Sequence, residues 1–134
     1  MIVRVEHIGI AVKTLAQSNQ LIEKLFGQPF YKTEKVESEN VTTSFFQLGE
    51  TKIELVEATN ADSSISKFID KHGEGIHHIA FEVDDIEKEM SRLKNEGFIL
   101  IHDKPKKGAD NKLICFLHPK STNGVLVELC QEIK

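Results

Sequence analysis

This 134-residue chain contains little cysteine or proline and no tryptophan: two Cys, three Pro and no Trp. Cys115 and Cys130 both lie inside apolar runs, which favours buried, reduced thiols over a disulfide or a redox pair. Hydrophobic residues make up 40% and charged residues 28%, values typical of globular proteins and not of disordered ones. A chain of this length can bury a core without covalent staples, so we expect one compact domain.

The chain also lacks a long apolar run, since no stretch approaches the roughly 20 residues that a membrane helix needs. Residues 1–6 show neither the apolar region nor the cleavage site of a secretory leader. The formal net charge of −4 provides no positive field for a nucleic-acid backbone. We therefore expect a cytoplasmic protein that binds neither membranes nor nucleic acids.

An internal repeat is the clearest positive feature. Residues 7–12 (HIGIAV) align with residues 78–83 (HIAFEV), so that His7 matches His78 and apolar residues match apolar residues. Both segments lead into a helix with a capping box, Thr14 with Gln17 in the first half and Asp84 with Glu87 in the second. Apolar residues at helical spacing follow in each half: Leu15, Leu21, Ile22, Leu25 and Phe26 before Gly27, and Ile86, Met90 and Leu93 before Gly97.

Strand-like segments follow each predicted helix. They cover residues 30–36, 41–48 and 51–57 in the first half, with a tight turn at Gly49-Glu50, and residues 98–102, 112–117 and 124–130 in the second. An amphipathic helix at 62–71, closed by Gly73, links the halves. The predicted fold is α+β: two tandem βαβββ modules, about 1–60 and 75–134, forming one curved mixed sheet around a metal-binding cleft in a single domain.

Strand parity separates a core face from a second face that carries ligand-type side chains. Apolar residues are assigned to the core face: Ile8, Ile10, Val12, Ile53, Leu55, Ile79, Phe81, Val83, Val125, Val127 and Leu129. The opposite face then carries His7 and Glu54 from the first half and His78 and Glu128 from the second. One such residue alone is more often a solvated polar side chain, but four matched positions favour a metal site.

These four side chains would converge if the halves curl round a common sheet. Mixed imidazole and carboxylate ligands suit Co²⁺, Mn²⁺, Ni²⁺, Zn²⁺ or Fe²⁺ better than Ca²⁺ or a thiolate-bound structural zinc. Four protein ligands on a six-coordinate ion leave two positions for a substrate that chelates through two oxygens. The sequence alone does not identify which ion is native.

Several segments carry a family resemblance that covers essentially the whole chain: residues 7–12, 52–55, 71–80, 83–86, 116–120 and 124–129. The chain resembles the vicinal-oxygen-chelate superfamily, which includes glyoxalase I, extradiol dioxygenases, bleomycin-resistance proteins and methylmalonyl-CoA epimerases. Within it, the paired His77-His78 and the Leu-His-Pro-Lys segment at 117–120 are most similar to the epimerases.

The resemblance implies that His7, His78 and Glu128 are metal ligands and that Glu54 occupies a Gln or Glu ligand position. By the same alignment His77 is a packing or supporting group, and Thr43 stands where some epimerases have a further glutamate. Members of the superfamily often form dimers, and an exposed strand edge at residues 1–5 would suit a homodimer.

The activity implied is interconversion of (2R)- and (2S)-methylmalonyl-CoA by metal-assisted removal and return of the α-proton. Glu128 and Glu54 are then candidate acid/base groups as well as ligands, whereas Glu37, Glu39, His102 and His118 are weaker candidates for the second face of the enolate. Lysines are candidate contacts for the CoA phosphates: Lys106 and Lys107 in the basic cluster at 104–108, and Lys120. A solvated loop is the simpler interpretation of the cluster.

Three alternatives remain open at this stage. A glyoxalase I-type lactoylglutathione lyase uses a similar ligand set, although its Leu-Thr-His segment is absent where this chain has Leu55-Val56-Glu57. An extradiol dioxygenase is disfavoured by the short chain and by the fourth ligand-type residue. A metal-free binding protein of the bleomycin-resistance kind shares the fold without needing the ligands.

Overall fold

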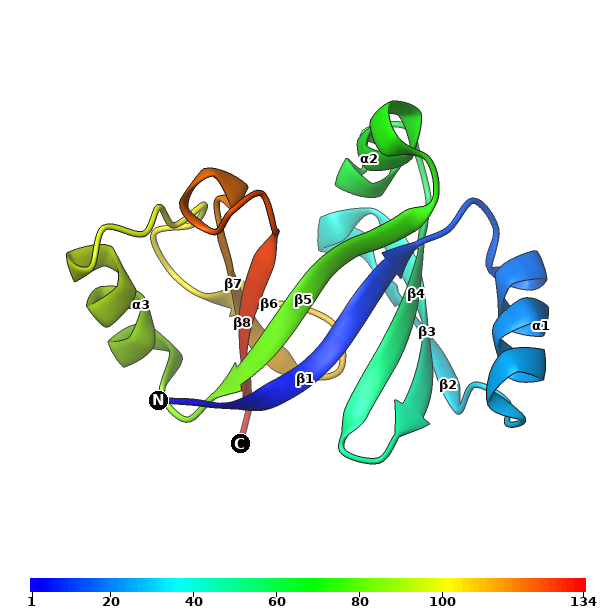
Figure 1. Cartoon of the computed structure of the whole chain (residues 1–134), viewed down its shortest axis with the longest axis horizontal. Coiled ribbons are helices and arrows are strands. Elements are labelled where there is room, and N and C mark those ends of the chain that lie inside the picture. Colours follow the sequence, from blue (N-terminus) through cyan, green and yellow to red (C-terminus); the bar gives the residue numbers. More distant parts are fainter. The chain divides into compact units, whose positions relative to one another are not determined.

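The computed structural model describes residues 1–134 and contains three α-helices, eight strands and two short 3₁₀ helices (Figure 1). The chain forms two compact units, each made mostly of one repeat. The first-repeat unit is Ile8–His77, and the second-repeat unit is Met1–His7 together with His78–Lys134. The chain passes from one unit to the other within β1 (Ile2–Ala11) and again within β5 (Gly75–Val83). No helix combines the length and apolar character needed to span a membrane.

The first-repeat unit contains α1 (Leu15–Phe26), β2 (Lys32–Val36), η1 (Glu37–Glu39), β3 (Val41–Leu48), β4 (Thr51–Ala58) and α2 (Ser64–His72). Strands β2, β3 and β4 pair in that order and are all antiparallel. The β3–β4 hairpin closes through two residues, with Gly49 at φ 58°, a left-handed conformation that glycine adopts without a steric penalty.

Helix α1 packs on one face of this sheet (Figure 1). The core there contains Val12, Phe46 and Leu55, with further packing from Ile10, Leu15, Ile22, Phe26, Phe30 and Ile53. The helix has the predicted ends, since the Thr14 side chain accepts a hydrogen bond from the Gln17 amide and Gly27 caps the C-terminus at φ 69°. Leu21 and Leu25 lie on the other side of the helix and are 65% and 73% exposed.

Helix α2 begins at Ser64, two residues later than predicted. The Ser63 hydroxyl accepts a hydrogen bond from the Ile65 amide at 3.2 Å and fixes this start, while Gly73 ends the helix as expected. Asp62 instead donates its amide to the side chain of Asn60, which keeps it in the preceding turn.

The second-repeat unit contains α3 (Ile86–Asn95), β6 (Lys106–Lys107), β7 (Lys112–Leu117), η2 (Pro119–Ser121) and β8 (Val127–Glu132), with β5 before them. The strand order is β5-β8-β7-β6, in which β5 and β8 are parallel and the other pairs are antiparallel. Both repeats therefore have the predicted βαβββ element order, and this sheet is mixed.

Helix α3 covers one face of the second-repeat sheet (Figure 1). Its core contains Val83, Ile86, Met90, Leu93, Cys115, Leu117 and Leu129. A second apolar cluster of Ala80, Ile114 and Cys130, with Phe116 against it, lies on side chains of the opposite parity. Both cysteines are buried and free, as predicted.

The sequence placed the start of α3 one residue too early. Asp85, and not Asp84, caps the helix by accepting a hydrogen bond from the Lys88 amide at 3.1 Å. Asp84 instead accepts a hydrogen bond from the N-terminal ammonium of Met1 at 2.7 Å. An aspartate cap was correctly expected, but Asp84 and Asp85 are adjacent and either could cap the helix. Because Asp84 binds the N-terminal ammonium, Asp85 is the cap.

Two predictions about the second repeat were wrong. Residues 98–102 form no strand beyond a single bridge between Leu100 and Leu117: Phe98 and Leu100 pack against the α3 core, Ile99 and Ile101 are exposed, and the edge strand is β6. Val125 is 42% exposed and outside the core, since β8 begins only at Val127. The Thr122 hydroxyl donates a hydrogen bond to the Val125 carbonyl, which holds that residue in the preceding turn.

Candidate metal centre

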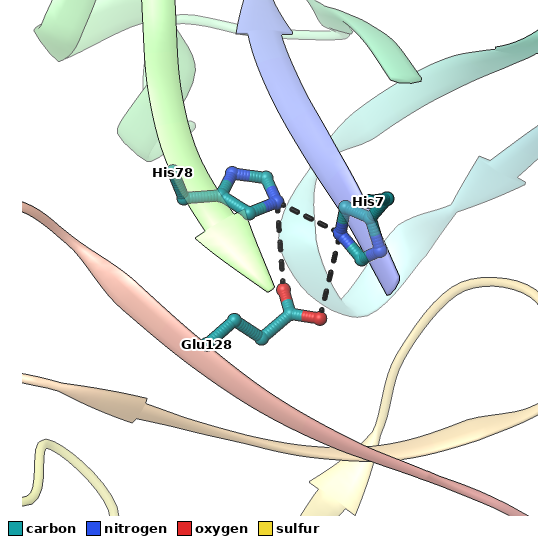
Figure 2. A group of neighbouring side chains, drawn as sticks. All are labelled: His7, His78 and Glu128. Carbon is teal, nitrogen blue, oxygen red and sulfur yellow. Dashed lines mark hydrogen bonds and ion pairs between the residues drawn. The ribbon is translucent and has the colours of Figure 1, made fainter. Parts of the chain in front are cut away.

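Three of the four predicted ligands meet in the second-repeat unit. His7 on β1, His78 on β5 and Glu128 on β8 point toward one another (Figure 2). The two imidazole Nε2 atoms are 3.1 Å apart, and each lies 3.6 Å from a different oxygen of the Glu128 carboxylate. All three residues are buried, with 5–7% of their surface exposed.

The parallel pairing of β5 with β8 brings His78 and Glu128 together. Ala80 is the register partner of Glu128, so His78 and Glu128 belong to the same face of the sheet, opposite to α3. Ala80 is fully buried and small, which leaves room for the longer carboxylate side chain beside it. The parity prediction is thus confirmed for this pair.

The donor atoms are spaced as ligands of a single ion would be. Ligands about 2.0–2.2 Å from a common ion, at angles between octahedral and tetrahedral values, lie roughly 2.8–3.6 Å from one another. The observed separations of 3.1, 3.6 and 3.6 Å fall in this range. Two imidazoles and one carboxylate are also donors that borderline divalent ions prefer, so the residues present fit such an ion.

An additional carboxylate that the sequence analysis did not select contacts this cluster. Glu6 is only 1% exposed, and its Oε1 lies 2.8 Å from Nδ1 of His7. Its other oxygen, Oε2, lies 3.7 Å from the guanidinium of Arg4. Strict strand alternation assigns Glu6 and His7 to opposite faces, which is why parity gave no indication of this contact.

An aromatic side chain borders the cluster on β7. Phe116 is the register partner of Glu128, and its ring lies edge to face with His78 at 5.9 Å between centroids. The ring of His102 contacts the same phenyl group at 6.1 Å. Phe116 therefore contacts the rings of both His102 and His78 and adds an apolar neighbour to the ligand cluster.

Glu54, the fourth predicted ligand, lies on β4 in the first-repeat unit and is 5% exposed. It pairs in register with Phe45, and Thr43 and Val56 share its side of that sheet, away from α1. Thr43, which the resemblance placed where some epimerases have a further glutamate, is also buried. The assignment of Glu54 as a ligand stays a prediction.

His77 lies half-buried against α2 and not in the ligand cluster. Its ring packs edge to face on Phe68, with 5.0 Å between centroids. Burial lowers the pKa of His77 from 6.5 to about 4, because the charged imidazolium is disfavoured away from water. His77 is therefore neutral at pH 7 and serves as a packing group, as the resemblance implied.

The remaining predicted residues lie in peripheral elements. Lys106 and Lys107 form β6 and pair with Ile114 and Leu113 of β7, so this part of the basic cluster is an edge strand. Lys120 is exposed in η2, whose N-terminus is capped by His118 through its Nδ1 atom. Two acidic candidates for the second face, Glu37 and Glu39, form η1.

The fold and these residues place the chain in a known class. Residues 6–116 match the Glyoxalase/Bleomycin resistance protein/Dioxygenase superfamily, and the chain belongs to this superfamily. The resemblance inferred from the sequence, and the α+β glyoxalase-like fold expected from it, are confirmed.

Within the superfamily, the similar proteins include several epimerases. The chain is 42% identical over 127 residues to the mitochondrial methylmalonyl-CoA epimerase of Dictyostelium discoideum, covering 94% of this chain and 76% of that protein. It is 40% identical over 133 residues to the ethylmalonyl-CoA/methylmalonyl-CoA epimerase of Cereibacter sphaeroides, covering 98% and 99%. A variant of the Streptomyces coelicolor methylmalonyl-CoA epimerase in complex with 2-nitronate-propionyl-CoA matches with a TM-score of 0.96 at 31% identity, over all of both chains.

Proposed function

We propose that this chain is a methylmalonyl-CoA epimerase, an isomerase that interconverts the (2R) and (2S) thioesters. The support comes from relatives with this activity in their names at 40–42% identity over nearly the whole chain. The observation that carries the proposal is the buried group of His7, His78 and Glu128, because it supplies both a metal-type donor set and a carboxylate that can accept a proton.

A divalent ion is the proposed cofactor, drawn from Co²⁺, Mn²⁺, Ni²⁺, Zn²⁺ and Fe²⁺. His7, His78 and Glu128 would hold it, and Glu54 is proposed as the fourth ligand. When bound, such an ion supplies Lewis-acid stabilisation of the negative charge that develops on the thioester carbonyl as the α-proton leaves.

Glu128 is the proposed acid/base group for one face of the enolate. Its two oxygens face different imidazoles, Oε1 toward His78 and Oε2 toward His7. One oxygen can therefore stay in the ligand set while the other accepts the α-proton and later returns it. A carboxylate oxygen bound to a cation is a weaker base than a free one, so the oxygen outside the ligand set is the one that would accept the proton. A positioned base contributes roughly 10²- to 10⁴-fold.

Epimerisation needs a second group on the other face of the planar enolate, and Glu54 is proposed for this role. Contacts to the CoA phosphates are proposed for Lys106, Lys107 and Lys120, whose ammonium groups match that charge. We further propose a single glyoxalase-like domain over residues 1–134 and a homodimer. The cytoplasmic location also stays a prediction, which cell fractionation would test.

The deciding experiment compares two substrates under the same conditions. The purified protein, loaded with Co²⁺, is assayed with methylmalonyl-CoA and with the hemithioacetal of methylglyoxal and glutathione. We expect epimerisation of the CoA thioester and no lactoylglutathione. Turnover of the hemithioacetal alone would favour the glyoxalase I alternative. Absence of both activities and of bound metal would favour the metal-free binding protein.

A further inference from the structure

We propose that Glu6 is a positioning residue that orients His7 for metal binding, an inference that rests on the metal centre of the proposed function. The contact is direct: Oε1 of Glu6 lies 2.8 Å from Nδ1 of His7, within hydrogen-bond distance. Both side chains are nearly inaccessible to solvent, so water does not compete for this hydrogen bond.

The hydrogen bond determines which ring nitrogen of His7 is available. A neutral imidazole has one N–H and one lone pair, and an ionised carboxylate can only accept. Glu6 therefore places the hydrogen of His7 on Nδ1 and leaves the lone pair on Nε2. That atom is the one 3.1 Å from Nε2 of His78 and 3.6 Å from Glu128. The ring is held with its donor atom already directed at the other ligands.

Arg4 in turn holds Glu6. Its Nη2 atom lies 3.7 Å from Oε2 of Glu6 and 3.1 Å from Oε1 of Glu82 on β5. One oxygen of Glu6 thus faces a guanidinium at ion-pair distance, and the other lies within hydrogen-bond distance of His7. The order Glu82, Arg4, Glu6, His7 links the two strands that carry the histidine ligands.

A supporting carboxylate of this kind fixes the tautomer and the ring orientation of a ligand histidine and makes it a better donor. Loss of such a partner typically weakens metal binding 10- to 100-fold. The same loss is expected here.

The test uses Glu6→Ala and Glu6→Gln, with Glu89→Gln as a matched control. Glu89 is another buried glutamate of the same unit, and it hydrogen-bonds Arg92 and the N-terminal ammonium instead of a ligand. Affinity for Zn²⁺ is measured by competition with a chromophoric chelator. The tautomer of His7 is read in metal-free protein at pH 8 from long-range ¹H–¹⁵N couplings. Urea unfolding of the metal-free proteins reports stability separately.

We expect the Nδ1–H tautomer of His7 in the wild-type protein and in Glu6→Gln, whose amide oxygen still accepts, and a tautomer mixture in Glu6→Ala. Zn²⁺ affinity should fall 10- to 100-fold in Glu6→Ala and less in Glu6→Gln, and should be unchanged in Glu89→Gln even if that variant is less stable. Wild-type affinity in Glu6→Ala would overturn this inference alone. Failure of the wild-type protein to bind any divalent ion would overturn it together with the metal centre.

Discussion

The Glu128→Gln substitution tests the proposed chemistry most directly. Gln has nearly the same volume as Glu, so the buried position next to Ala80 and Phe116 should still be filled. The amide oxygen can still face one imidazole, but the nitrogen that replaces the second oxygen is not a base. Exchange of the α-proton of methylmalonyl-CoA with solvent deuterium should therefore fall at least about 100-fold, the lower end of what a positioned base contributes.

That loss corresponds to about 2.7 kcal/mol in the activation free energy. Shortening the side chain in Glu128→Asp retains the charge but withdraws the carboxylate by about 1.5 Å, one C–C bond length. The present 3.6 Å contacts to the two imidazoles would then lengthen to roughly 5 Å. A misplacement of this size costs on the order of 100-fold as well.

The assay follows deuterium incorporation by NMR or mass spectrometry at equal metal occupancy, so that weaker metal binding is not mistaken for loss of a base. Glu132→Gln is the control, because Glu132 lies on the same strand but is solvent-exposed. Deuterium incorporation at the wild-type rate in metal-loaded Glu128→Gln would refute the acid/base role of Glu128.

Three further predictions concern buried or partly buried residues of the two units. A methyl group at Gly108 would lie 2.8 Å from Cδ1 of Ile114, so Gly108→Ala should cost about 1–3 kcal/mol in urea unfolding, and combining it with Ile114→Val should cost less than the sum of the two. The buried hydroxyl of Ser44 has no hydrogen-bond partner, so Ser44→Ala should raise the free energy of unfolding by about 1 kcal/mol; a loss of that size would show an undetected partner. The folded protein binds a proton at His77 less readily than the unfolded chain, because folding lowers the pKa of His77 from 6.5 to about 4. The free energy of unfolding should therefore be independent of His77 above pH 6.5 and should fall by up to about 3 kcal/mol toward pH 4. His77→Phe should flatten that dependence in metal-free protein, and an unchanged slope would assign it to other groups.

Local signals in the sequence predicted most of the elements. Thr14 and Gly27 delimit α1, and Gly49 closes the β3–β4 hairpin, because capping and turn geometry depend on residues only a few positions apart. Local signals gave a wrong prediction for a short apolar segment that could pack either as a strand or as a loop against a helix. Residues 98–102 have strand-like composition, yet Phe98 and Leu100 pack against the α3 core and β6 is the edge strand.

For the candidate site, the sequence by itself determined the repeat that pairs His7 with His78 and the alternation that puts His78 and Glu128 on the side of the sheet away from α3. The repeat is visible as similarity between residues 7–12 and 78–83, and the alternation follows from the two-residue period of a strand. Only the tertiary structure decided that β8 pairs in parallel with β5, which brings those side chains within 3.6 Å. It also decided the contact of Glu6 with His7, because the direction of a buried carboxylate is set by the arginine and imidazole that surround it and not by strand parity.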